Sequence, residues 1–252
     1  MSPSDRIHLI LPAFNEGANL LPLFESFTQL PNLERYRFHL INDGSSDNTE
    51  DIAKSIEGQV DLKLITHPTN RGLSKTLLTG VESALQESGS DDILIFMDAD
   101  NTHLPSQIPE MISKIKSGAD IVIASRYQPG STIEGLSNFR KSFSVLASFL
   151  FRTLLPISGV KDFSCGFRAV KAGLVRNLSR DELNLIFSSR GFACTTGFLL
   201  ALTRNKEIVV AEIPMRLKYN QKRGVSKMNL KQTSYESLKL IAREWYKRNC
   251  AK

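Results

Sequence analysis

Two aspartates separated by a single residue form the sharpest chemical pattern in this sequence. Asp98 and Asp100, with Ala99 between them, directly follow the wholly apolar run at 93–97. Carboxylates that leave a buried strand lie at the edge of a low-dielectric core, where two like charges are costly without a cation. Their oxygens suit Mg²⁺ or Mn²⁺, and phosphate oxygens can complete the shell. The pattern predicts a divalent-metal site for a phosphate-bearing ligand, with solvated loop aspartates as the alternative.

Polar side chains also follow the other apolar runs of the first half. The residues after the runs at 7–11, 36–41, 62–66 and 121–124 include Pro12, Ala13, Asn15, Glu16, Asp43, Arg71 and Arg126. Asp43 can accept hydrogen bonds from a base or a ribose, or can cap the next helix. Each residue alone is a weak indication, and their convergence at one place in the fold is what predicts a binding site.

The elements that must position these residues alternate along the chain. Strands are expected at 7–11, 36–41, 62–66, 93–97 and 121–124, and helices from about 18 and over 46–57, 73–86 and 106–116. This alternation is typical of an α/β fold with a mainly parallel sheet and helical crossovers. Such sheets bind ligands beyond the carboxyl ends of their strands. No GxGxxG or GxxxxGK[ST] motif opens a helix, which disfavours dinucleotide and P-loop binding.

The composition excludes a disordered or fibrous protein. The 252 residues are 41% hydrophobic and 23% charged, which is typical of a globular domain. Lys and Arg number 32 against 26 Asp and Glu, and a basic excess suits phosphate-rich ligands or an anionic membrane surface. The 3 cysteines form no CxxC pattern, and the N-terminus does not resemble a signal peptide. We therefore expect a cytoplasmic protein, peripheral at the cytoplasmic face of a membrane.

Two amphipathic segments lie in the second half. No run reaches the roughly 20 apolar residues that a spanning helix needs. Residues 143–155 and 229–252 show helical spacing, with Val145 and Phe149 opposite the main apolar face of the first segment. Either helix can pack on the core, lie on a membrane surface or contact a membrane-protein partner. We expect a catalytic domain over 1–228 and a basic amphipathic helix over 229–252.

Six motifs carry a resemblance to a known family. Residues 11–16 (LPAFNE), 42–47 (NDGSSD) and 96–100 (FMDAD) resemble family 2 glycosyltransferases of the GT-A fold. Residues 125–127 (SRY), 162–168 (DFSCGFR) and 223–227 (RGVSK) are similar to the dolichyl-phosphate mannosyltransferase and polyprenyl-phosphate glycosyltransferase branch. The resemblance extends from about residue 7 to residue 230.

The resemblance implies roles for particular residues. It implies that Pro12, Ala13 and Glu16 line a nucleoside pocket and that Asp43 contacts the base or ribose. Asp98 and Asp100 would hold the metal and the donor diphosphate. The remaining members of the implied substrate-binding set are Asn15, Ala99, Arg126, Arg140, Arg223 and Lys227, of which the three arginines and the lysine face phosphates. The chain departs from the branch pattern at Thr102, at Gly197 and at Ser74-Lys75, where a glutamine, a glutamate and a glycine-rich turn are common.

The sequence also indicates which chemical group accepts the sugar. Transfer to a hydroxyl normally needs a general base, and no Glu-Asp pair occurs between 187 and 202. A phosphate acceptor needs cations, which Arg126, Arg140, Arg223 and Lys227 would supply. Asp162 as a base would keep the hydroxyl alternative open. We therefore expect inverting, metal-dependent transfer of a hexosyl group from a GDP- or UDP-sugar to a polyprenyl or dolichyl phosphate. The alternatives are transfer to a hydroxyl of a glycan, metabolite or protein, and a non-catalytic nucleotide-binding module; no nucleic-acid partner is expected.

Overall fold

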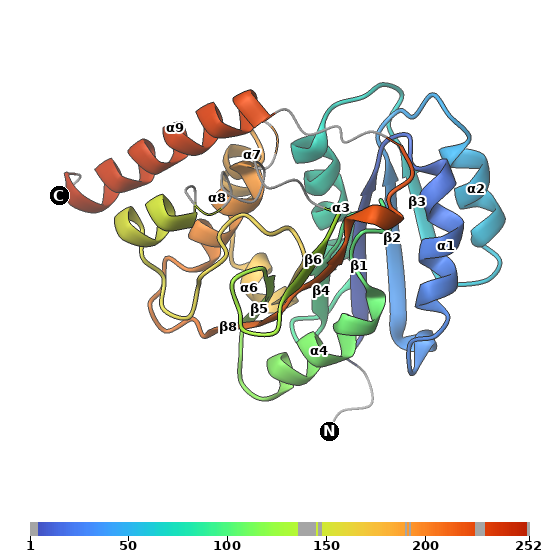
Figure 1. Ribbon diagram of the computed structural model, residues 1–252, viewed down its shortest axis with the longest axis horizontal. Helices are drawn as coiled ribbons and strands as arrows, with labels where there is room; N and C mark the ends of the chain where they lie inside the picture. Colours follow the sequence, from blue (N-terminus) through green and yellow to red (C-terminus); the bar gives the residue numbers. More distant parts are fainter. Residues whose placement is uncertain are drawn as a thin grey trace.

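A seven-stranded sheet forms the centre of the molecule. The computed structural model describes residues 5–135, 145, 148–189, 191, 193–224 and 230–250. The sheet runs in the order β3-β2-β1-β4-β7-β5-β8, with helices packed on it (Figure 1). Its strands are β1 (Ile7–Ala13), β2 (Tyr36–Asn42), β3 (Leu62–Thr66), β4 (Ile93–Phe96), β5 (Ile121–Ser125), β7 (Arg168–Lys171) and β8 (Val210–Pro214). The predicted mainly parallel α/β fold is confirmed, and each expected strand lies within about two residues of its predicted position.

One strand reverses the direction of the sheet. β7 lies between β4 and β5 and runs antiparallel to both, with Arg168 opposite Phe96 and Ile123. Arg168 therefore begins its strand at the edge where β4 and β5 end. A second, two-stranded parallel sheet pairs β6 (Thr132–Glu134) with β9 (Arg216–Lys218).

Helices surround the sheet, and most of them bury an apolar stripe. They are α1 (Gly17–Phe27), α2 (Thr49–Ile56), α3 (Leu73–Glu87), α4 (Ile108–Lys116), α6 (Ala172–Arg176), α7 (Arg180–Ile186), α8 (Ala193–Leu202) and α9 (Leu230–Asn249). Gly80 lets α3 approach the sheet closely, since a Cβ there would lie 2.4 Å from the Ile10 side chain. Strand β4 is wholly buried, as its continuous apolar sequence predicted.

Helix α2 begins later than the sequence predicted. We expected it from Ser46, but it starts at Thr49. The Asp47 carboxylate accepts hydrogen bonds from the backbone N–H of Thr49 at 3.0 Å and of Gly17 at 3.1 Å. These bonds hold residues 45–47 in a loop that is tied to the start of α1, so the chain cannot enter the helix there.

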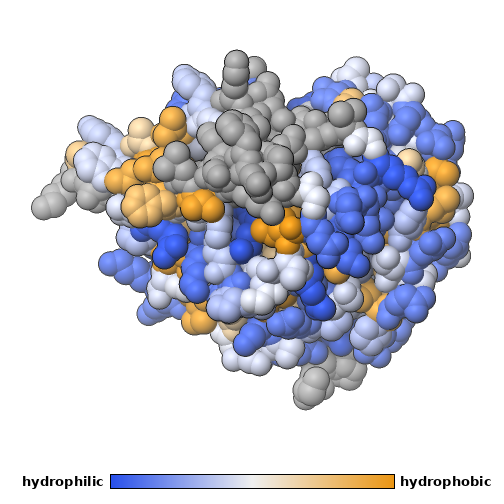
Figure 2. All heavy atoms as spheres, viewed as in Figure 1, coloured by the Kyte–Doolittle hydropathy of each residue, from blue (hydrophilic) through white to orange (hydrophobic). Residues whose placement is uncertain are grey.

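The two amphipathic segments form helices with partly exposed apolar faces. Residues 148–154 are helical, with Phe151 buried and Phe149 61% exposed. Helix α9 buries Leu240 and Ile241, whereas Trp245 is 43% exposed. Figure 2 shows apolar side chains at the surface around α9. Within the described ranges, none of the helices has both the length and the apolar character that crossing a bilayer requires.

Candidate active site

The strand order brings the ends of β1 and β4 together at one edge of the sheet. Met97, directly after β4, donates its backbone N–H to the Ile10 carbonyl at 3.2 Å. Strand β1 lies between β2 and β4, so the chain leaves β1 to one side and returns on the other side as β4. Such a switch in direction opens a crevice beyond the strands. Pro12 and Asp98 line the same pocket there.

The loops after β1 and β2 form one cross-linked rim. Asn15 has a positive φ of 52°, and its Oδ1 accepts a hydrogen bond from the Ser46 backbone at 2.8 Å. Its own N–H donates to Ser45 Oγ at 2.9 Å. The N–H of Glu16 donates to Thr49 Oγ1 at 2.8 Å. The two loops that the sequence singled out therefore support each other, and their contact with a nucleoside stays a prediction.

Asp43 organises three loops at the same edge. Its N–H donates to the Ala13 carbonyl at 2.8 Å, which joins the ends of β2 and β1. Its Oδ1 bonds to His67 Nδ1 at 2.7 Å and accepts from the Arg71 N–H at 2.9 Å, and its Oδ2 accepts from the Gly72 N–H at 2.8 Å. The carboxylate thus holds the start of α3 against the sheet. Its predicted contact with base or ribose stays a prediction.

The two aspartates after β4 lie close together but have different partners. Asp100 is 9% exposed, and its Oδ1 accepts from the Thr102 N–H at 3.1 Å and from Thr102 Oγ1 at 2.7 Å. Its Oδ2 lies 2.6 Å from the Lys222 ammonium. Asp98 lines the pocket instead. Thr102 therefore orients the second aspartate.

Because Asp98 and Asp100 have different partners, their pKa values are shifted in opposite directions. Burial, together with the charge of Asp100, raises the pKa of Asp98 to about 7. Burial also raises the pKa of Asp100, but the nearby Lys222 ammonium, His103 and the hydrogen bond from Thr102 outweigh it and hold that pKa below its ordinary value. The site therefore keeps a negative charge on Asp100 and leaves the charge of Asp98 incompletely compensated.

The donor set suits a hard divalent cation. Carboxylate oxygens from Asp98 and Asp100 are the ligands that Mg²⁺ and Mn²⁺ prefer, and the raised pKa of Asp98 indicates negative charge that a cation would relieve. No group of three or more His, Cys, Asp or Glu residues within the described parts of the chain could hold an ion. Two aspartates would therefore leave the rest of the shell to water or to the oxygens of a phosphate ligand.

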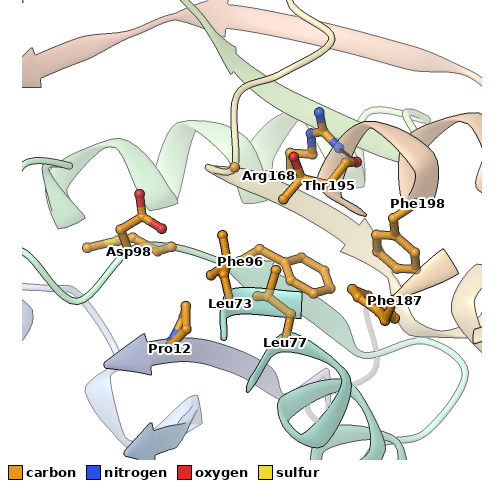
Figure 3. Close-up of a pocket in the computed structure, with 11 residues that line it drawn as sticks. Pro12, Leu73, Leu77, Phe96, Asp98, Arg168, Phe187, Thr195 and Phe198 are labelled. Atoms are coloured by element: carbon orange, nitrogen blue, oxygen red, sulfur yellow. Dashed lines mark hydrogen bonds between the residues drawn. The ribbon is translucent and has the colours of Figure 1, made fainter. Parts of the chain in front are cut away.

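A mostly apolar pocket lies beside Asp98 (Figure 3). Pro12 comes from β1, Phe96 from β4, Leu73 and Leu77 from α3, and Phe198 from α8. The other lining residues are Met97, Gly166, Arg168, Phe187 and Thr195. The acidic group thus lies at one side of a hollow that is lined mostly by apolar side chains, and such surroundings strengthen electrostatic interactions with a bound ligand.

Arg126 and Asp162 form a buried ion pair at the same edge. Arg126 Nε donates to Asp162 Oδ2 at 2.8 Å, and Nη2 donates to Oδ1 at 2.7 Å. Asp162 Oδ1 also accepts from the Cys165 N–H at 3.0 Å. Burial raises the pKa of Asp162, but the Arg126 guanidinium outweighs it and holds that pKa below its usual range. A carboxylate held this way is a weak proton acceptor, so the geometry suits an ion-pair partner better than a general base.

Glu212 on β8 holds the backbone on which Asp162 lies. Its Oε1 accepts from the backbone N–H of Lys161 at 2.7 Å and of Asp162 at 2.8 Å. Its Oε2 accepts from Gln128 Nε2 at 3.1 Å. One carboxylate thus fixes the loop that carries Asp162, and through Asp162 it fixes the orientation of Arg126.

The segment that carries Arg223 docks on the start of α1. The Arg223 N–H donates to Asn19 Oδ1 at 2.9 Å, and Asn19 Nδ2 donates back to the Arg223 carbonyl at 3.0 Å. The same Asn19 amide donates to Glu16 Oε2 at 2.6 Å. Gly224, with φ of 102°, follows directly. The structure therefore places this late segment beside the first loop of the sheet.

The predicted residues form two neighbouring groups. Pro12, Glu16, Asp98 and Asp100 surround the crevice, and Arg126 and Asp162 form the ion pair. Ala13 and Ala99 are buried beside them. Arg140 and Lys227 lie outside the described residues. Three further residues at the site, Lys222, Glu212 and Arg168, were not predicted from the sequence. Only the position of Arg168 at the end of the motif at 162–168 could have pointed to it.

These features define a class of protein. Residues 8–178 match the family model described as glycosyl transferase family 2. The fold agrees: glucosyl-3-phosphoglycerate synthase from Mycobacterium tuberculosis superposes with a TM-score of 0.67 at 20% identity, over 98% of this chain and 80% of that one. The chain belongs to glycosyl transferase family 2.

Curated relatives in the same family are more similar in sequence. Dolichol-phosphate mannosyltransferase from Pyrococcus furiosus is 33% identical over 94% of this chain, which spans 63% of that protein's length. Polyprenol monophosphomannose synthase from Mycolicibacterium smegmatis is 29% identical over 90% of this chain and 82% of its own length. Undecaprenyl-phosphate mannosyltransferase from Micrococcus luteus is 27% identical over 89% of this chain and 88% of its own length. The branch that the sequence motifs resembled is therefore the branch of these relatives.

Proposed function

We propose that this protein transfers a hexosyl group from a nucleotide-sugar to a polyprenyl phosphate and inverts the anomeric centre. The observation that carries the proposal is the pairing of an acidic crevice after β4 with cationic groups around it, in a chain whose candidate base is already engaged. The names of the curated relatives agree with this acceptor class.

On the donor side, the loops after β1 and β2 would receive the nucleoside. Glu16 lies on the rim, and Asp43 presets the loop at Arg71 that faces the same edge. Asp98 and Asp100 would hold a divalent cation, which when bound neutralises charge on the diphosphate leaving group. The Mycobacterium tuberculosis enzyme is described in complex with Mn²⁺ and UDP, which makes these two ligands reasonable first probes.

On the acceptor side, an anionic phosphate needs positioning and charge compensation. A phosphate oxygen would form the new bond to C1 of the sugar while the bond from C1 to the diphosphate breaks with its electron pair. No proton has to be removed, so Asp162 can stay bound to Arg126 throughout the reaction. Arg126 and Arg223 would supply cationic donors at either side of the crevice. The exposed Phe149 and Trp245 suit contact with the membrane that contains such a lipid.

A product-partition assay tests the proposal. The protein would be incubated with labelled GDP- and UDP-hexoses, Mn²⁺ or Mg²⁺, and a short polyprenyl phosphate, and the label would be counted in water and organic phases. We expect an organic-phase product with one donor. The matched acceptor is the same polyprenol without phosphate, from which we expect no product.

The Asp100→Asn variant serves as the protein control, because it retains the shape of the site and removes one metal-binding charge. A water-soluble product that forms without lipid would overturn the acceptor and favour transfer to a hydroxyl. Absence of any product with all donors would count against the proposed activity as a whole.

A further inference from the structure

Lys222 lies inside the acidic crevice, although no motif pointed to it. Its ammonium is 2.6 Å from Asp100 Oδ2, and the two side chains are 11% and 12% exposed. Its backbone is also held: its N–H donates to the Tyr219 carbonyl at 3.3 Å, and the next residue, Arg223, is bonded to Asn19. A lysine so placed is part of the site and not a mobile surface charge.

The charges around Lys222 do not balance. The carboxylates of Asp100 and Glu16 both act on its ammonium, and Asp98 experiences the charges of all three groups. When Asp98 is ionised, as it would be with a cation bound, three carboxylates against one ammonium leave a formal excess of two negative charges. The buried His103 adds no cation near neutral pH, since burial lowers its pKa to about 4, and Arg126 is paired with Asp162. The excess matches the charge of one divalent ion.

The lysine occupies an oxygen that a bound cation would need. Asp100 Oδ1 already accepts from Thr102, and Oδ2 bonds to Lys222. A divalent ion that uses Oδ2 therefore competes with the ammonium for that oxygen, and the two cations repel each other. An ammonium displaced within a crevice that also binds a diphosphate has phosphate oxygens as its next acceptors.

We propose that Lys222 is a diphosphate-binding residue that occupies the Asp100 oxygen until a divalent cation takes it. The proposal deepens the proposed function, since it rests on a metal and diphosphate site at Asp98 and Asp100. It makes a prediction of opposite sign for two ligands. Lys222 weakens binding of the cation alone, because the two compete, and strengthens binding of a nucleoside diphosphate together with the cation.

The test measures both affinities in the full chain. Mn²⁺ alone would be titrated by the loss of its free-ion EPR signal, and GDP and UDP would each be titrated by calorimetry with saturating Mn²⁺. In Lys222→Met we expect Mn²⁺ alone to bind roughly tenfold tighter and the favoured nucleotide to bind roughly tenfold weaker. Lys218→Met, which removes the same charge from the half-buried end of β9, should change neither value. Lys222→Gln repeats the test with a polar replacement.

Each outcome decides the proposal. Equal or weaker Mn²⁺ binding in both Lys222 variants would overturn it, because a merely structural lysine would weaken both ligands. Failure of the wild type to bind Mn²⁺, or to bind either nucleotide with Mn²⁺, would overturn it as well. Shifts of opposite sign without any lipid product would support the role of Lys222 and reject only the proposed acceptor.

Discussion

The carboxylate of Asp162 and the carboxylates after β4 lie at one edge of the same sheet, but different partners neutralise them. Arg126 binds Asp162 through two donors, and the backbone and Glu212 complete that group. Asp98 and Asp100 share the charge of Lys222. Accordingly the pKa of Asp162 is lowered, whereas that of Asp98 is raised to about 7. The first group is complete within the protein, and the second is complete only with a ligand.

The largest expected effect comes from removing charge at the incomplete site. Asp98→Asn should lower kcat/KM in the partition assay by about a thousandfold, because a diphosphate loses its bound cation. The free energy of unfolding in urea should stay equal or rise, since a buried repulsion with Asp100 is removed. A variant that transfers sugar normally, or that is clearly less stable, would remove the distinction between the two sites.

Asp162→Asn should mainly reduce stability, whereas Asp98→Asn should mainly reduce activity. The change leaves the buried Arg126 without a counter-charge, so the free energy of unfolding should fall by about 3 kcal/mol. The loss of activity should follow the loss of folded protein and of Arg126 orientation. Urea denaturation and nucleotide affinity would be measured together. Turnover that disappears while stability and affinity remain intact would instead identify Asp162 as a base.

The pH dependence of stability should differ in sign between Asp98 and Asp162. Without divalent ions, folded Asp98 keeps a proton that the unfolded chain releases, because its pKa is about 7 and the ordinary value is 3.8. Wild type should therefore lose stability relative to Asp98→Asn as pH rises between these values, by up to about 1.4 kcal/mol per pH unit.

The contribution of Asp162 to stability has the opposite pH dependence, because the pKa of this residue is lowered in the folded protein. Its contribution is fully present above pH 3.8 and is lost as pH falls through the folded pKa, so Asp162→Asn should approach wild-type stability in acid. The free energy of unfolding of wild type, Asp98→Asn and Asp162→Asn, measured in EDTA over a series of pH values, checks both expectations. Parallel curves would contradict the assignment of one complete and one incomplete site.

The smallest expected effect concerns the support behind the complete site. Glu212→Gln keeps the shape of the side chain but weakens its charge-assisted bonds to the backbone of Lys161 and Asp162. We expect a loss of about 1 kcal/mol in the free energy of unfolding. Glu207→Gln, at an exposed position before the same strand, should have no effect. Equal effects of the two changes would exclude a specific support by Glu212.

The parallel strands of the first half could be predicted from the sequence because they are mainly apolar runs, most of which are buried. A strand such as β4 must be continuously apolar, and this pattern also marks its end, where Asp98 and Asp100 stand. Strand β7 has no such pattern: four residues that begin with Arg168 become a central strand only through pairing with β4 and β5. Its position was therefore decided by tertiary contacts.

The missed site residues have a related explanation. Lys222 lies in a charge-rich stretch where a solvated side chain is the ordinary expectation, and only the docking of Arg223 on Asn19 brings it into the crevice. Glu212 resembles any polar residue of an edge strand until the loop at Asp162 folds over it. Such long-range placements leave no local periodicity for a sequence to display.

The reversed strand β7 has a consequence for how the molecule can diversify. Because β5 ends and β7 begins at the same edge, the chain between Ser125 and Arg168 leaves the sheet and re-enters it at nearly the same place. An excursion with adjoining ends can lengthen, shorten or change its shape while the strands beneath keep their register. The chain in this excursion can thus change while the loops after β1 and β4 stay as they are.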